Sequence, residues 1–109
     1  MQRAQYASRG PVPQDVIECV DYTLPELGPG EVLVEMLASP INPSDVLTLT
    51  GQYGMLPPLP AIGGNEGIGR VAAVSEGVKL PIGQRVVLPI GAGAWSSHLI
   101  AREIGRAHV

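Results

Sequence analysis

Hydrophobic and polar residues alternate most clearly over residues 31–39. Val32, Val34, Met36 and Ala38 recur at every second position of this stretch. A period of two places these four side chains on the same side of an extended chain. The pattern therefore predicts a β-strand that turns this side toward a hydrophobic core.

Five further segments predict short strands, although their alternation is less regular. They are residues 2–8, 15–22, 66–75, 84–89 and 95–101. The chain contains 14 glycines and 11 prolines among 109 residues, which is roughly twice the usual share. Short strands joined by turns of this composition favour an all-β fold of the barrel type.

One short helix is predicted between Asn42 and Gly51. Asn42 can cap a helix N-terminus, and Pro43 suits the first helical position, where its missing N–H costs nothing. Gly51 supplies a stop. Residues 51–64 then hold three prolines and predict a long loop, and long loops in compact domains are frequently functional.

Length and charge narrow the function classes. The 109 residues fit a single domain, and a net charge of −3 argues against nucleic acid or an anionic membrane as partner. No apolar run reaches the ~20 residues of a membrane-spanning helix, and the first residues lack the apolar core of a secretory signal. The single cysteine, Cys19, excludes an internal disulfide and is expected to be a small core residue. A soluble, cytoplasmic domain is expected.

Glycine clusters at residues 63–69 and 91–93 invite comparison with nucleotide-binding loops. Neither has the Gly-x-Gly-x-x-Gly spacing, and no helical pattern follows either of them. A phosphate-binding glycine turn needs that helix N-terminus. We therefore expect these glycines to allow tight turns and close backbone approach.

Two residues are candidates for proton chemistry. Tyr53 lies in the predicted loop and could donate a proton or hydrogen bond if a pocket forms around it, although most such tyrosines are half-buried packing residues. His98 lies on a predicted strand without a carboxylate or cysteine nearby in sequence, which favours a structural role.

Three motifs together resemble the N-terminal half of the medium-chain dehydrogenases and reductases. They are Asn-Pro-Ser-Asp at 42–45, Gly-Gln-Tyr-Gly at 51–54 and Gly-Gly-Asn-Glu-Gly at 63–67. Within this superfamily the chain is most similar to the zinc-free trans-2-enoyl-thioester reductases, and quinone reductases are near relatives. The resemblance extends to about Arg102. It implies a GroES-like domain over residues 1–102, mainly β, folded as an irregular, partly open barrel with one short helix.

The resemblance also implies a function. Such a domain is the catalytic, substrate-binding part of an NADPH-dependent reductase of 2-enoyl thioesters, while a separate Rossmann domain, expected to be missing here, holds most of the NADPH. The fragment alone is then expected to be inactive, and its parent to be a homodimer. Tyr53 matches the family's catalytic tyrosine, which helps to bind the thioester carbonyl. Asn42 matches a position lining the cleft near the nicotinamide, or serves only as the helix cap. A quinone reductase and a non-catalytic GroES-like binding module are the alternatives.

Zinc-containing relatives hold a catalytic zinc with a cysteine and a histidine. The matching positions here read Asn42 and Asn65, and an amide is a poor zinc ligand beside thiolate and imidazole. We therefore expect no zinc.

The last seven residues, 103–109, depart from the family pattern. They resemble the translation of a short sequencing adapter, and we interpret them as a non-native tail that carries no weight in the prediction of fold or function.

Overall fold

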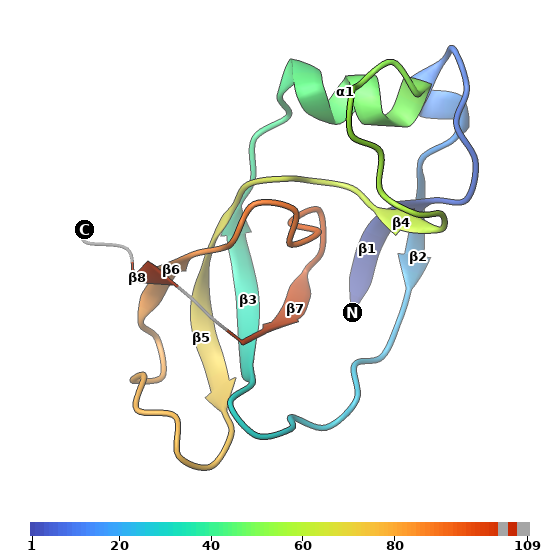
Figure 1. The fold of residues 1–109 in the computed structure, drawn as a ribbon. Coiled ribbons are helices and arrows are strands. Elements are labelled where there is room, and N and C mark those ends of the chain that lie inside the picture. The colour runs from blue at the N-terminus through green and yellow to red at the C-terminus, as the bar shows by residue number, and fades with distance from the viewer. Residues whose placement is uncertain (103–104, 107–109) are drawn as a thin grey trace.

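The computed structural model describes residues 1–102 and 105–106, and within them the chain forms two antiparallel sheets and one α-helix (Figure 1). The first sheet has the order β2-β1-β4, with β1 Gln2–Tyr6, β2 Glu18–Asp21 and β4 Ala61–Ile62. The second has the order β7-β3-β5-β6-β8, with β3 Val32–Ala38, β5 Ile68–Val74, β6 Arg85–Val87, β7 His98–Ala101 and β8 Gly105–Arg106. The helix α1 is Pro43–Thr50, and a 3-10 turn, η1, spans Pro13–Asp15.

The segment before β7 joins the two sheets. Ser96 forms an isolated antiparallel bridge with Arg3 of β1. The Ala4 N–H donates to the Trp95 carbonyl at 2.8 Å, and the Met36 N–H of β3 donates to the Ser97 carbonyl at 2.9 Å. The strands thus follow one another from β2 around to β8 without closing. This arrangement confirms the expected mainly β, partly open fold with one short helix.

The main core lies inside the second sheet. Its buried members are Val32, Val34, Val71, Val86, Leu88, Leu99 and Ala101. The predicted alternation of β3 is confirmed where it contacts this core, because Val32 and Val34 are buried and Met36 packs against the cluster. Ala38 was expected on the buried side but is exposed. The pairing with β5 shifts between Met36 and Ala38, and this irregularity breaks the two-residue period.

A smaller core attaches α1 to the first sheet. Tyr6 of β1, Leu49 of α1 and Ala61 of β4 are buried together, with Trp95 packed against them. The helix has the predicted bounds, and Gly51 ends it in the left-handed conformation at φ +83°. In Figure 1 the helix lies across one end of the sheets, and the loop that follows it folds back toward β4.

Two sequence expectations fail in this region. Residues 61–62 were expected to belong to the long loop, yet they pair with Gln5 and Tyr6 as β4. A two-residue strand is too short to show a period. Cys19 was expected in the core but is exposed, because β2 is an edge strand.

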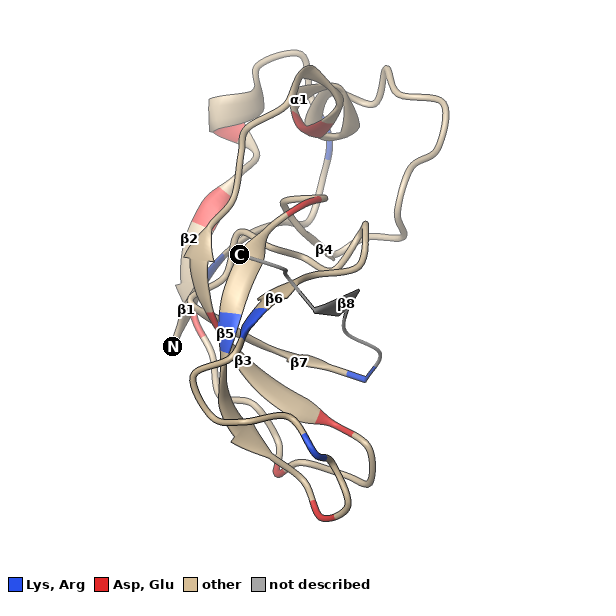
Figure 2. Ribbon diagram, turned by 90° about the vertical axis from the view of Figure 1, so that its left-hand side faces the viewer, with Lys and Arg blue, Asp and Glu red and all other residues tan. Residues whose placement is uncertain are grey.

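The last expectations concern the tail and the surface. The interpretation of residues 103–109 as a non-native tail stays a prediction, because 103–104 and 107–109 lie outside the described residues. Acidic and basic residues are scattered along the ribbon in Figure 2 rather than gathered into a basic stripe. Within the described part of the chain, no helix is long and apolar enough to cross a membrane.

Candidate active site

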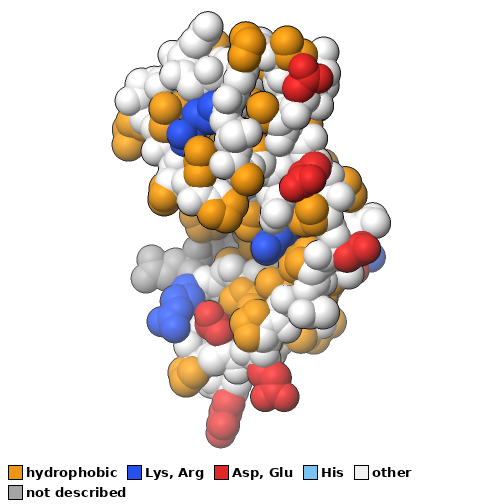
Figure 3. Space-filling model, turned by 90° about the vertical axis from the view of Figure 1, so that its right-hand side faces the viewer, with side chains coloured by type: hydrophobic (Ala, Val, Ile, Leu, Met, Phe, Trp, Pro, Cys, Tyr) orange, Lys and Arg blue, Asp and Glu red, His pale blue; other side chains and the backbone are white. Residues whose placement is uncertain are grey.

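A cavity of about 270 Å³ opens beside α1. Its walls come from the helix, the loop after it, the glycine segment 63–65 and residues 90–91. Tyr53, Met55 and Ile90 are among the lining residues and are also partly open to solvent. Figure 3 shows hydrophobic side chains spread over the upper part of one face, where the helix and its loop lie. The cavity thus combines an apolar rim with a small number of polar groups, as ligand sites do.

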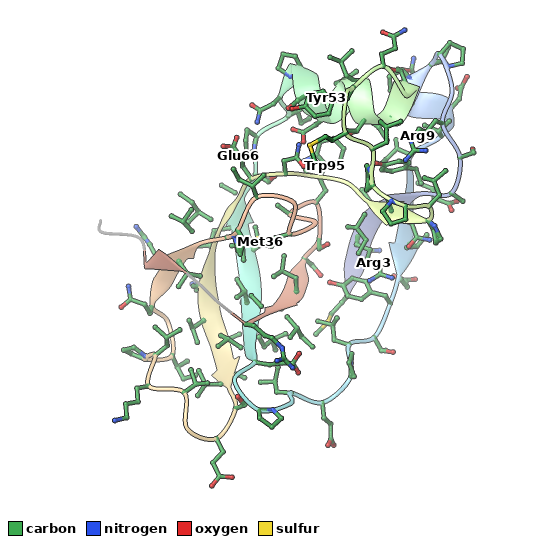
Figure 4. All side chains as sticks on the ribbon, viewed as in Figure 1. Arg3, Arg9, Met36, Tyr53, Glu66 and Trp95 are labelled. Carbon is green, nitrogen blue, oxygen red and sulfur yellow. The ribbon has the colours of Figure 1, made fainter. Side chains whose placement is uncertain are left out.

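Tyr53 is one of those polar groups. It follows the helix stop at Gly51 by two residues, lines the cavity and is 41% exposed. Within residues 1–102 the structure shows no hydrogen bond from its hydroxyl to another side chain or to the backbone. A phenol in this state can donate to a ligand in the cavity. Figure 4 shows Tyr53 beside α1.

Asp45 organises the inner wall of the cavity. It is the third residue of α1 and only 3% exposed. Its Oδ2 accepts the Asn42 N–H at 2.8 Å, and its Oδ1 accepts the Asn65 N–H at 3.1 Å. Both oxygens are thereby satisfied, and the negative charge sits in the first helical turn, where the helix dipole favours it. This carboxylate fixes the start of the helix to the glycine segment.

Sequence reasoning missed Asp45 as a site residue. Its position three residues after Asn42 is the signal of a capping box, and that signal was present in the sequence. The bond to Asn65 has no local signal, because the fold alone brings these two residues together.

Asn42 caps the N-terminus of α1, and its N–H donates to Asp45 of the cavity wall. Asn42 itself is not among the residues that line the Tyr53 cavity. Its side-chain Nδ2 donates to Glu66 Oε2 at 2.7 Å. Glu66 lines a separate hollow of about 540 Å³ with Pro40 and Ile68. The structure therefore brings Tyr53 together with Asp45 and Asn65, and places Asn42 beside Glu66.

The glycine segment is filled by neighbouring side chains. A Cβ on Gly63 would lie 2.2 Å from Cε3 of Trp95, and a Cβ on Gly64 would lie 2.6 Å from its Cδ1. Gly67 and Gly69 are equally crowded, by Met36 and Val34 respectively. The expectation of close backbone approach is confirmed. No helix begins after these glycines among the described residues, so they lack the helix N-terminus that a phosphate-binding glycine turn uses.

The structure also bears on the predicted absence of zinc and on the predicted role of His98. No three His, Cys, Asp or Glu side chains gather as a metal site among the described residues; that the protein holds no zinc stays a prediction. His98 lies on β7 with its Nδ1 at 3.1 Å from Ser97 Oγ and does not line the Tyr53 cavity. This placement agrees with a structural role.

Comparison with known families decides the class of this fold. A family model described as the alcohol dehydrogenase GroES-like domain matches residues 28–104. The chain belongs to this family, the GroES-like domain of the medium-chain dehydrogenases and reductases. The match begins after β2 and includes β3, α1, the Tyr53 loop and the glycine segment.

Curated relatives extend the similarity. The mitochondrial enoyl-[acyl-carrier-protein] reductase of Bos taurus is 44% identical over 93 residues, which are 84% of this chain and 25% of that protein. The enzyme of the same name from Homo sapiens is 42% identical over the same share of each chain. This GroES-like domain thus spans about a quarter of the length of these relatives.

Solved structures agree with the fold. A mitochondrial 2-enoyl thioester reductase Etr1p/Etr2p heterodimer from Candida tropicalis aligns with a TM-score of 0.88 and 30% identity, over 97% of this chain and 33% of that chain. An Etr1p complex with NADP and crotonyl-CoA gives a TM-score of 0.87 at 29% identity, over the same shares. A protein described as an NADPH:quinone reductase from Bacillus thuringiensis gives 0.84 at 35% identity, over 96% and 32%.

Proposed function

We propose that residues 1–102 are the catalytic, substrate-binding domain of a longer NADPH-dependent 2-enoyl thioester reductase. The observation that carries the proposal is the cavity that Tyr53 shares with the Asp45–Asn65 pair. Relatives named for this activity are similar over most of the chain. Because no helix follows the glycine segment among the described residues, we propose that most of the NADPH is held by another part of the longer protein.

The proposed chemistry is reduction of a carbon–carbon double bond conjugated to a thioester carbonyl. Bound NADPH would supply the hydride for the β-carbon; the negative charge would then be carried by the thioester carbonyl oxygen until a proton from solvent completes the reduction at the α-carbon. The Tyr53 hydroxyl donates a hydrogen bond to that oxygen. A donor already in place where charge develops is worth more in the transition state than in the ground state.

The rim of the cavity suits an acyl group. Met55 and Ile90 are 82% and 83% exposed, and Ile62, which also lines the cavity, is 37% exposed. Exposed apolar side chains beside one polar donor favour a ligand with a hydrocarbon part and a single carbonyl.

Asn42 is proposed as the residue on the cofactor side of the domain. One N–H of its Nδ2 donates to Glu66, which leaves the second N–H as a donor and Oδ1 as an acceptor for a cofactor. The Glu66 contact holds the side chain in one orientation. Its role in capping α1 through its backbone is compatible with this assignment.

Assembly and location follow from the relatives only as proposals. One solved relative is a heterodimer of two similar chains, and we propose a dimer for the longer protein. The curated relatives are named mitochondrial, whereas the sequence led us to expect the cytoplasm. A mitochondrial location is the proposal that these names favour.

Quinone reduction is the second candidate function, because the Bacillus thuringiensis protein is 35% identical over 96% of the chain. The two candidate functions are tested in a longer protein that contains this chain, by following NADPH oxidation with crotonyl-CoA and with a benzoquinone. The proposal predicts a clear preference in kcat/KM for crotonyl-CoA. A preference for the quinone would overturn the assignment and favour the second candidate.

A further inference from the structure

The loop that carries Tyr53 has few attachments to the rest of the domain. Residues 52–60 are all exposed. At its start the Gln52 N–H donates to the Leu47 carbonyl at 3.0 Å, and at its end Ala61 pairs with Tyr6. Between these points, the structure shows no backbone–backbone hydrogen bond from residues 53–60 to any other described residue. A loop of this kind needs a side chain to hold it in one position.

Arg9 supplies that attachment. One of its guanidinium nitrogens, Nη2, donates to the carbonyl oxygen of Pro57, 48 residues further along the chain. Its stem lies over the end of the helix, where the Cδ atom is 3.5 Å from the point that a Cβ on Gly51 would occupy. Arg9 therefore touches both limbs of the loop, the one that leaves α1 and the one that returns to β4. Figure 4 shows it below the end of α1 from which the loop starts.

Arg9 itself lies in a segment that is hydrogen-bonded to α1. It follows β1, and the next residue, Gly10, donates its N–H to the Leu49 carbonyl of α1 at 3.2 Å. The Arg9 Nε is buried and has no hydrogen-bond partner among the described residues. The Arg9 side chain is only partly exposed, so part of it packs against the domain while its Nη2 reaches the Pro57 carbonyl.

We propose that Arg9 is a positioning residue that holds the loop so that the Tyr53 hydroxyl faces the cavity. Its effect on turnover rests on the proposed function, whereas its effect on the loop does not. Arg9 acts through the loop and makes no contact with substrate.

The first test uses the 109-residue chain and limited proteolysis with chymotrypsin. Loss of the guanidinium in Arg9→Ala is expected to raise the cleavage rate after Tyr53 and Met55 roughly tenfold, the effect of one lost hydrogen bond. Cleavage after the buried Tyr6 reports on global unfolding and should not change. Arg3→Ala is the matched control, because Arg3 stacks on the Tyr22 ring at 4.5 Å and is not near the loop. Equal cleavage after Tyr53 in both variants and the wild type would overturn the proposal.

The second test measures turnover of crotonyl-CoA in a longer protein that contains the chain. Arg9→Ala should lower kcat roughly tenfold and leave the KM for NADPH unchanged, while Arg9→Lys, which retains a donor, should recover most of the loss. A parallel loss in Arg3→Ala, or no loss in Arg9→Ala, would contradict the role in turnover. If the wild-type protein does not reduce crotonyl-CoA, the proposed function fails. The role of Arg9 in holding the loop is then decided by the cleavage rates of the first test.

Discussion

Replacement of Asp45 by asparagine tests whether its carboxylate joins the helix to the glycine segment. The side chain is 3% exposed, and each oxygen accepts one backbone N–H, from Asn42 and from Asn65. Asparagine has nearly the same shape but replaces one acceptor with an NH₂ donor. One of the two N–H groups then faces another donor in a buried place, where neither finds a partner.

The magnitude follows from these contacts. A hydrogen bond to a charged group contributes about 1.5–3 kcal/mol, and a negative charge in the first turn of a helix contributes about 0.3–1 kcal/mol more. Asp45→Asn is therefore expected to lower the free energy of unfolding by about 2–4 kcal/mol. For a domain of this size the loss corresponds to a fall in Tm on the order of 10–20 °C.

Thermal unfolding followed by circular dichroism measures the change. Asp21→Asn is the control, because Asp21 lies on the edge strand β2, is exposed and has no side-chain hydrogen bond or ion pair among the described contacts. Its Tm should stay within about 2 °C of wild type, as surface substitutions usually do. An equal Tm for Asp45→Asn and Asp21→Asn would refute the role of the carboxylate.

Two further predictions concern the packing and the cofactor. A Cβ on Gly63 would lie 2.2 Å from Trp95, so Gly63→Ala is expected to lower the free energy of unfolding by about 1–3 kcal/mol in urea titrations and to shift the emission of the single tryptophan. Gly54→Ala is the control, because no atom lies within 4 Å of its Cβ position, and it should change neither quantity. Unchanged stability and emission in Gly63→Ala would contradict the packing. The 109-residue chain is expected to bind NADPH weakly, because it has no Gly-x-Gly-x-x-Gly turn. Low-micromolar binding in calorimetry would show that this reasoning is wrong.

Local signals predicted the parts of the fold that depend only on neighbouring residues. The alternation of Val32 and Val34 gave β3, and the Asn42 and Gly51 signals gave both ends of α1. The pairing of Ala61 with Tyr6 joins residues 55 positions apart, and the bond from Asp45 to Asn65 spans 20. No local pattern encodes such contacts, which explains why β4 and the inner wall of the cavity were missed.

In the candidate site, too, the motifs predicted the residues but not their tertiary contacts. Tyr53 was identified from its motif, and the structure adds the cavity that it lines. The Asn42 motif did not show that its side chain contacts Glu66 rather than the Tyr53 cavity. A motif identifies a residue type at a position in the chain, but the neighbours of that residue follow from the tertiary packing.

The most direct test of the proposed function is the turnover of Tyr53→Phe in a longer protein that contains this chain, with crotonyl-CoA and NADPH. Phenylalanine keeps the ring and its packing and removes only the hydroxyl. Loss of one donor to a developing oxyanion typically lowers kcat by about 10²–10³, and we expect this loss with a much smaller change in KM and an unchanged Tm. Full kcat in Tyr53→Phe would contradict the account, because Tyr53 would then be a packing residue and its cavity would not be the site of this reduction.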